Sequence, residues 1–402
     1  MEQSLLNKCT CSQSWRRLKT GFKNKNYFAL LFSILLTSLC FVLVLNIEKG
    51  LNALIIYSFI IVAYAVFLVS IKEYSDKLFW LIVAIAIMYR LLPCLVLSTT
   101  FSNDLIQYSF LGNKILNGGI PYRDFPAPYP PLSLYVTVPF VMTGDLRFLK
   151  AFFSLCDILI VFIVYKVFLQ GAENKNRISM LLFLFPVSLI EYSVSGHNDS
   201  LTVLLLIASI ALLDKSVAVS SVLMALSILS KIFPVVLVPF VLRHLYSNNK
   251  KSALFFLSML VAVLFTVSLP FVLLSWDGYI SMIIGVTRYS VPYGVLISLI
   301  NLLFNFTPSS IMFFHLLAII LLIEFCALIF IISSRRKWSL MKTCGICLLI
   351  LPFLLPQFHP WYLLWAFPFI TIYFSNNLKL IRGYMLLFLV SHILFYLIFS
   401  FN

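Results

Sequence analysis

The segment SALFFLSMLVAVLFTVSLPFVLLS, residues Ser252–Ser275, contains no charged side chain. An apolar run of about twenty residues is long enough to cross a bilayer as an α-helix. Comparable runs recur along the whole chain, with shorter apolar pieces between them: Tyr27–Asn46, Leu51–Ile71, Leu78–Leu97, Ile311–Ser333 and Gly383–Phe401. We therefore expect an all-α polytopic integral membrane protein with roughly ten to thirteen transmembrane helices, some of the shorter pieces being re-entrant or interfacial.

The composition of the chain supports this class. Of the 402 residues, 62% are hydrophobic and only 11% are charged, which excludes an ordinary soluble domain. No linker or change in composition marks a second domain, so we expect one transmembrane unit, residues 27–402, behind a basic tail, residues 1–26. The first apolar run has no small-residue cleavage site and is expected to be retained. The cysteines lie mostly in or beside apolar runs, where a thiol packs as a small hydrophobe.

The distribution of basic residues predicts which ends of the helices face the cytoplasm. Cytoplasmic loops of membrane proteins are rich in Lys and Arg, which accounts for the net charge of +15 without a nucleic-acid surface. The segments expected inside are the N-terminal tail, 72–77, 170–177, Lys215, Arg243–Lys251, Arg335–Lys342 and Lys379–Arg382. The segments expected outside are a large loop, 98–131, the turns around His197, Lys231 and His359, and the loop from Trp276. Leu132–Met142 is then a partial or interfacial helix, and Leu296–Phe304 dips into the membrane and returns.

The large outer loop begins with a predicted amphipathic helix. Ser102 or Asn103 is a suitable N-cap, and four apolar residues share one helical face, namely Leu105, Tyr108, Leu111 and Ile115. Gly118-Gly119 ends the helix, and a proline-rich segment returns the chain to the membrane. Asp104 either complements the helix dipole or takes part in catalysis. Asp124, beside Arg123, is either one half of a turn ion pair or a second functional acid.

Three further polar segments interrupt apolar sequence on the same predicted side. Ser195–Ser200 has the residues of a tight turn, but His197 and Asp199 at the edge of the hydrocarbon region are candidates for function. Lys231 either extends to lipid headgroups or binds a phosphate-bearing lipid. Gln357–Tyr362 resembles an interfacial aromatic belt, although such a belt does not require His359.

Taken together, these motifs resemble the GT-C superfamily of polytopic glycosyltransferases, in particular its prokaryotic mannosyltransferase-like branch. The matching motifs occur in the family's order over roughly residues 78–370: Asn103-Asp104, Tyr129-Pro130-Pro131-Leu132, Gly196-His197-Asn198-Asp199, Lys231-Ile-Phe-Pro234 with Pro239, and His359-Pro360-Trp361-Tyr362 with Pro368. Two features depart from the usual pattern. The acidic loop follows the third predicted span rather than the first, and Asp104 is a single acid rather than a member of an adjacent pair.

The resemblance implies transfer of a hexose, mannose or glucose, from a polyprenyl-phosphate donor to a hydroxyl group, with inversion at C1. The acceptor would be a glycolipid, a lipid-linked glycan or a protein at the outer side of the cytoplasmic membrane, and the N-terminus would be cytoplasmic. It further implies roles for particular residues: Asp104 as the base, with Asp124, His197 and Asp199 as further catalytic candidates; Lys231, Arg123, Arg288 and His359 at the donor phosphate; and Tyr129, Trp361 and Tyr362 lining the acceptor site. No residues are assigned as metal ligands. The resemblance leaves one cofactor open, a divalent cation such as Mg²⁺ or Mn²⁺.

Two other classes of protein remain open from the sequence. A transporter or lipid flippase would use Asp157, Glu191 and Glu324 as a mid-membrane pathway or proton relay. A non-catalytic subunit of a glycosylation complex would tolerate the loss of Asp104. The gathering of the motifs on one predicted side of the membrane favours the enzyme.

Overall fold

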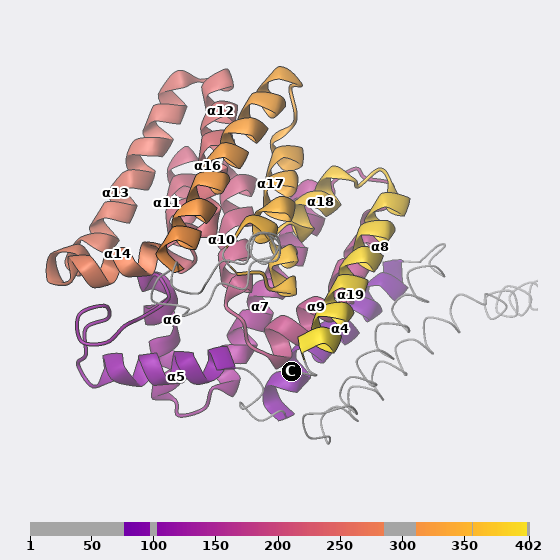
Figure 1. Cartoon of the computed structure of the whole chain (residues 1–402). Helices are drawn as coiled ribbons and strands as arrows, with labels where there is room; N and C mark the ends of the chain where they lie inside the picture. Colours follow the sequence, from indigo (N-terminus) through magenta and orange to yellow (C-terminus); the bar gives the residue numbers. More distant parts are fainter. Residues whose placement is uncertain (1–75, 97–102, 285–310, 356, 400–402) are drawn as a thin grey trace, which may run out of the picture.

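The structure is a computed structural model that describes residues 76–96, 103–284, 311–355 and 357–399. These residues form a bundle of helices, drawn in Figure 1. The described part of the chain has no β-strand, and one isolated bridge joins Pro121 and Phe125. The predicted spans Tyr27–Asn46 and Leu51–Ile71, the basic tail and the predicted re-entrant segment Leu296–Phe304 lie outside the described residues.

The helices follow one another with short connections. Their bounds are α4 Asp76–Val96, α5 Asn103–Leu116, α6 Pro131–Met142, α7 Arg147–Ile163, η3 Val164–Phe168, α8 Lys175–Phe183, α9 Pro186–Ser188, η4 Leu189–Val194, α10 Asp199–Leu212, α11 Val217–Ser230, η5 Phe233–Leu237, α12 Val238–Asn248, α13 Lys250–Leu274, α14 Trp276–Ile284, α16 Ile311–Arg335, α17 Leu340–Leu354, η7 Pro360–Trp365, α18 Phe367–Tyr373 and α19 Leu378–Phe399. Helices η3 and η4 are π-helical turns, and η5 and η7 are 3₁₀ turns, each beside a polar segment or a bend.

Four helical segments of the described ranges are long and apolar enough to cross a membrane: Arg147–Phe168, Lys175–Val194, Lys250–Leu274 and Leu317–Arg335. The apolar runs predicted at 78–97, 252–275, 311–333 and 383–401 correspond to α4, α13, α16 and α19. Helices α13 and α16 expose large apolar side chains, as a lipid-facing surface requires; Phe265 is 62% exposed and Ile323 is 63% exposed. The all-α polytopic class is confirmed.

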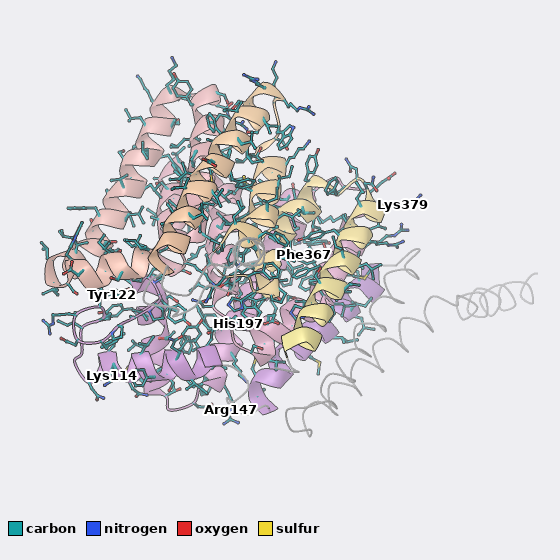
Figure 2. All side chains as sticks on the ribbon, in the orientation of Figure 1. Lys114, Tyr122, Arg147, His197, Phe367 and Lys379 are labelled. Atoms are coloured by element: carbon teal, nitrogen blue, oxygen red, sulfur yellow. The ribbon has the colours of Figure 1, made fainter. Side chains whose placement is uncertain are left out.

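The two ends of the bundle differ in the way the charge pattern predicts. The turns between α12 and α13, between α16 and α17, and between α18 and α19 lie together at the end opposite α5 (Figure 1). These turns carry the basic segments expected inside, and Lys379 and Lys114 mark the two ends in Figure 2. The structure therefore groups the basic turns at one end and α5 at the other, while their assignment to cytoplasm and exterior stays a prediction.

Helix α5 lies across the other end of the bundle (Figure 1). Leu105, Tyr108 and Leu111 are buried against α6, α7 and the loop that follows α5, which confirms the predicted apolar face. The helix ends as expected before Gly118, whose φ of 83° lies in the left-handed region that favours glycine. On its outer face Ile106 and Phe110 are exposed, as in a helix lying at a membrane interface.

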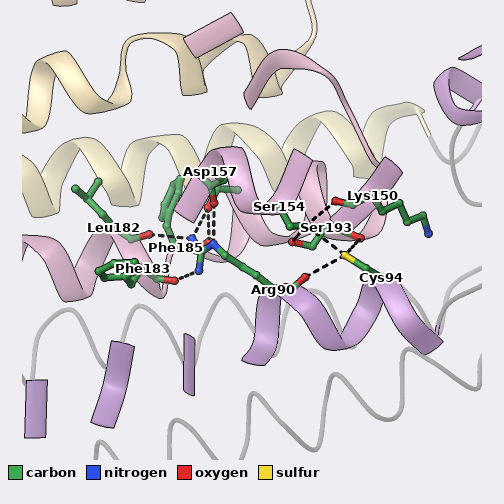
Figure 3. Close-up of polar contacts among 10 residues, drawn as sticks. Arg90, Cys94, Lys150, Ser154, Asp157, Leu182, Phe183, Phe185 and Ser193 are labelled. Carbon is green, nitrogen blue, oxygen red and sulfur yellow. Dashed lines mark hydrogen bonds and ion pairs between the residues drawn. The ribbon is translucent and has the colours of Figure 1, made fainter. Parts of the chain in front are cut away.

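A buried ion pair holds α4 against the break between α8 and α9 (Figure 3). Arg90 Nε lies 2.7 Å from Asp157 Oδ2, and the same guanidinium donates to the carbonyl oxygens of Leu182 and Phe183 and to Ser188 Oγ. Pro186 cannot continue the helix, so these terminal carbonyls need another donor. Arg90 supplies it, and Asp157 balances its charge.

Candidate active site

Asp104, on the first turn of α5, contacts a histidine from a distant turn. His197 Nδ1 lies 2.9 Å from Asp104 Oδ2, although 93 residues separate the two along the chain. The other ring nitrogen, Nε2, lies 3.1 Å from Glu191 Oε2 on η4. The Asp104 side chain is 25% exposed, the His197 side chain 8% and the Glu191 side chain 0%, so the group runs from an accessible carboxylate into the protein interior.

A glycine allows the turn that carries His197 to lie directly beneath α5. Gly196 has φ of 73°, and a Cβ atom there would lie 2.8 Å from Leu105 Cδ2. Any other residue would therefore be strained in its backbone and would displace the α5 side chain. The His197 backbone N–H donates to Glu191 O over 3.0 Å, which closes the turn at the end of η4.

The second oxygen of Asp104 faces the loop that follows α5. Tyr129 Oη lies 3.3 Å from Asp104 Oδ1 and donates to Gln107 Oε1 over 2.9 Å. Tyr122 Oη in turn donates to the backbone oxygen of Tyr129 over 2.6 Å, which fixes this part of the loop. The proline-rich return of the loop thus brings Tyr129 to the carboxylate.

Aromatic rings from the polar segment Gln357–Tyr362 cover His197, which is labelled in Figure 2. The His197 ring stacks on Trp361 with 4.5 Å between centroids, and Trp361 stacks on His359 with 4.3 Å between centroids. Burial by itself lowers the pKa of His197, but the hydrogen bonds and charges of Asp104 and Glu191 outweigh it and raise that pKa to about 10. An imidazolium held against the face of an indole ring is also a favourable cation–π arrangement.

A second cluster forms around Lys231, at the end of α11. Lys231 Nζ lies 2.6 Å from Asp199 Oδ1, and Trp365 Nε1 donates to the same oxygen over 2.5 Å. The ammonium also lies 4.8 Å from the centroid of the Tyr362 ring. Lys231 is buried and turned inward onto Asp199, and is not extended to the surface as an interfacial lysine would be.

A cavity of about 240 Å³ opens beside Lys231. Apolar side chains of η5, α14, α16 and α17 form most of its wall, among them Val235, Ile283 and Ile319, each of which is also well exposed on the outside of the bundle. Tyr129 lines the same cavity and therefore belongs both to the Asp104 cluster and to this wall. The arrangement is that of an apolar groove with one cation, Lys231, in its wall.

Gln357 is a further polar residue in the wall of this groove. It is 5% exposed, and neither its amide nitrogen nor its amide oxygen has a hydrogen-bond partner among the described residues. A buried amide of this kind gains free energy from any ligand that pairs with it.

The remaining predicted site residues lie apart from these clusters. Arg123 and Asp124 bind each other through contacts of 2.8 and 2.9 Å on an exposed turn. The hydrogen bonds from Arg123 and from the backbone N–H of Ile120 lower the pKa of Asp124 to about 2. This is the geometry of a turn ion pair. Arg288 lies outside the described residues.

Several residues of the site were not assigned to it from the sequence. The sequence indicates Glu191 only as part of a transport pathway, and it predicts no role for His392 or Trp365. An ionisable residue inside an apolar run is a signal that can be read from sequence, and both Glu191 and His392 carry it. In the described part of the chain, no group of three or more His, Cys, Asp or Glu side chains is arranged to hold a metal ion.

Two family models match separate parts of the chain. Residues 122–247 match the model described as alpha-(1->6)-mannopyranosyltransferase, N-terminal domain, and residues 286–397 match the MptB C-terminal domain. The first match contains Tyr129, His197 and Lys231, and the second contains His359 and His392. No solved structure matches the chain.

Two curated relatives are each named GPI mannosyltransferase 1. The protein of Debaryomyces hansenii is 29% identical over 157 residues, which is 36% of this chain and 38% of the relative. The protein of Dictyostelium discoideum is 25% identical over 138 residues, which is 33% of this chain and 31% of the relative. The similarity therefore spans about a third of the length of either relative.

Proposed function

The chain belongs to the GT-C-like membrane mannosyltransferases, and from this premise we propose that it transfers a mannosyl group from a polyprenyl-phosphate donor to a hydroxyl acceptor. The reaction takes place at the outer side of the cytoplasmic membrane and inverts the configuration at C1. The acceptor is a glycolipid, a lipid-linked glycan or a protein. Both curated relatives are named mannosyltransferases, which supports mannose as the sugar.

One observation carries this proposal: an accessible carboxylate, Asp104, contacts a residue of an apolar groove whose wall also contains a cation. Asp104 contacts Tyr129, and Tyr129 lines the groove together with Lys231. A polyprenyl-phosphate sugar consists of an apolar chain, a phosphate and a reactive carbon, in that order. These three groups match the apolar wall, the cation and the carboxylate of the site. With the chain along the apolar wall and the phosphate towards Lys231, C1 of the sugar is directed towards Asp104.

The reaction needs one proton acceptor and one stabilised leaving group. The acceptor oxygen forms a bond to C1 while the bond from C1 to the phosphate oxygen breaks, and the polyprenyl phosphate leaves with the electron pair of that bond. Asp104 takes the proton of the acceptor hydroxyl, a contribution typically of about 10²–10⁴-fold in rate. A single displacement at C1 gives inversion.

Lys231 meets the charge that grows on the leaving phosphate. Asp199, Tyr362 and Trp365 hold its ammonium in place before the donor arrives, so little reorganisation is needed during the reaction. His359 and Gln357 are further donors on the same side of the site. No step is routed through a metal ion, and Arg123 and Asp124 are given no part in this mechanism.

The proposal is tested with purified protein in lipid nanodiscs. Polyprenyl-phosphate mannose and polyprenyl-phosphate glucose are each supplied with a panel of hydroxyl acceptors, and transfer and donor hydrolysis are scored separately. We expect transfer of mannose that requires the lipid phosphate and does not occur from a nucleotide sugar. Turnover with a nucleotide sugar alone, or none with either lipid donor, contradicts the proposal.

The positions of the three acids that a transporter would use argue against that class of protein. Asp157 pairs with Arg90 at the end of α8, and Glu191 lies behind the Asp104 site between two histidines. Glu324 lies on the exposed face of α16. The three acids thus lie in three different environments and do not line one path.

A further inference from the structure

Two buried ionisable residues behind the site have no part in the mechanism above. Glu191, on η4, and His392, on α19, are both fully buried, with Glu191 Oε1 2.7 Å from His392 Nε2. The other oxygen of Glu191, Oε2, lies 3.1 Å from His197 Nε2. One carboxylate therefore lies between two imidazole rings that come from different parts of the fold.

The contacts of His197 require an additional proton. Each of its ring nitrogens faces a carboxylate oxygen, from Asp104 on one side and from Glu191 on the other. A neutral imidazole has only one N–H, so it would direct a lone pair at one of these two oxygens. A ring protonated on both nitrogens has an N–H for Asp104 and carries positive charge beside Glu191.

The burial of the Glu191 carboxylate also favours a protonated His197. A carboxylate removed from water is costly unless hydrogen-bond donors and positive charge surround it. His197 and His392 each face one of its oxygens. Removing the charge of Glu191 would take one of the two anions away from His197.

We propose that Glu191 and His392 are positioning residues that keep His197 doubly protonated, and that this imidazolium keeps Asp104 ionised and oriented towards the groove. The proposal rests on the proposed function in its use of Asp104 as the base. Neither residue touches the substrate. Their effect reaches Asp104 through the His197 ring, which is held flat against Trp361.

The charged and titratable groups around His197 come from every element packed against it. They are Asp104 on α5, Glu191 on η4, His392 on α19 behind Glu191, and His359 on the far side of Trp361. Tyr129, from the loop after α5, contacts the other oxygen of Asp104. Of these groups, the Asp104 and Glu191 carboxylates contact the His197 ring nitrogens and carry negative charge, so they favour its protonated form.

The first test is the pH dependence of turnover in three variants. Glu191→Gln removes the charge and keeps the shape, His392→Leu removes the donor to Glu191, and His392→Gln keeps a donor without the imidazole ring. Because its two carboxylate neighbours raise the pKa of His197 to about 10, we expect this ring to stay protonated at neutral pH in the wild type. Loss of one nearby opposite charge lowers the pKa of His197 by about 1–3 units.

We therefore expect kcat of Glu191→Gln to fall on the alkaline side at a pH about 1–3 units lower than in the wild type. His392→Leu should change in the same direction, His392→Gln should restore most of the wild-type profile, and KM for the donor should change less than twofold. A matched control is His244→Gln, because His244 also faces a carboxylate, Asp214, but does so on an exposed loop. An unchanged profile in folded Glu191→Gln overturns the proposal.

The second test does not depend on activity. The chain has five histidines, so ¹⁵N-histidine labelling gives a small set of ring signals. At pH 8, above the ordinary range of histidine, we expect one doubly protonated ring in the wild type, and in Glu191→Gln we expect the titration of that ring to move about 1–3 pH units lower. Detection of neutral rings only in the wild type overturns the proposal. If the wild type transfers no sugar but shows the protonated ring, the proposed function fails and the protonation of His197 stands.

Discussion

Replacing Asp104 by Asn separates its two interpretations, because each predicts a loss of a different size. Asn is nearly isosteric and can still cap the start of α5. Its amide oxygen can accept from His197 Nδ1–H, and its amide nitrogen can donate to Tyr129 Oη, so both contacts of the carboxylate have a neutral replacement. The fold around the site should therefore be retained.

The structural cost of Asp104→Asn follows from the contacts that lose charge. Removal of a negative charge from the first turn of a helix costs about 0.3–1 kcal/mol. Exchange of one charge-assisted hydrogen bond for a neutral one costs about 1 kcal/mol more. Because the Asp104 side chain is 25% exposed, solvent screening keeps the sum near the lower end, about 1–2 kcal/mol.

The catalytic cost is larger and appears in a different measurement. Loss of a general base lowers the rate by about 10²–10⁴-fold, which corresponds to about 2.7–5.5 kcal/mol in the activation free energy. We expect kcat to fall by this factor while KM for the donor and the thermal unfolding temperature change little. Initial rates of mannose transfer and thermal unfolding in the same nanodisc preparation measure both quantities.

A matched control for this variant is Asp145→Asn. Asp145 is also an acid just before a helix at the same end of the bundle, where it pairs with Arg147, and it contacts no residue of the site. Its replacement should leave kcat unchanged. Turnover of Asp104→Asn within about threefold of the wild type would remove Asp104 as the base, since a general base contributes more than that.

Three further predictions address the phosphate, the outer loop and the membrane orientation. Lys231→Met leaves Asp199 as a buried unpaired acid and is expected to lower the free energy of unfolding by about 3–5 kcal/mol. Adding Asp199→Asn should restore the unfolding temperature but not donor binding. Full donor affinity in the double variant would exclude Lys231 from the phosphate site. Gly278→Ala places a Cβ atom directly against the backbone oxygen of Tyr122 and should cost about 1–3 kcal/mol with lower turnover, whereas Gly383→Ala, into open space, should be neutral. Equal unfolding temperatures of the two variants would show that the loop can move aside. In a cysteine-free chain, a cysteine that replaces Asn113 should react with an impermeant maleimide from outside the cell. A cysteine that replaces Ser247 should react only after the cell is permeabilised. The reverse result would place the proposed active site on the cytoplasmic side.

The parts of the fold that could be predicted from sequence are those set by local pattern. The charge-free run at 252–275 is α13 because a bilayer leaves its backbone no alternative to a helix. The face of α5 was predictable because Leu105, Tyr108 and Leu111 recur at helical spacing, and its end because two glycines precede a proline. Each of these inferences needs only neighbouring residues.

The contacts of the site could not be predicted in the same way. Asp199 and Lys231 were each assigned a role of their own, and nothing in the sequence says that they bind each other across 32 residues. Glu191 and His392 are 201 residues apart, and an ionisable residue in an apolar run indicates that a partner exists without indicating which one. The pairing is decided by how α19 packs against η7 and η4, which depends on long-range contacts.

The contact between Glu191 and His392 also bears on how the protein is made. A membrane protein is inserted in order from its N-terminus, so η4 and α10 enter the bilayer well before α19. Until α19 packs, Glu191 is a buried acid held on one side only, by His197. Such a carboxylate is costly in an apolar environment and favours either protonation or an open, hydrated intermediate. The site therefore reaches its working charge state only as a late event in biogenesis, when the helix Leu378–Phe399 docks.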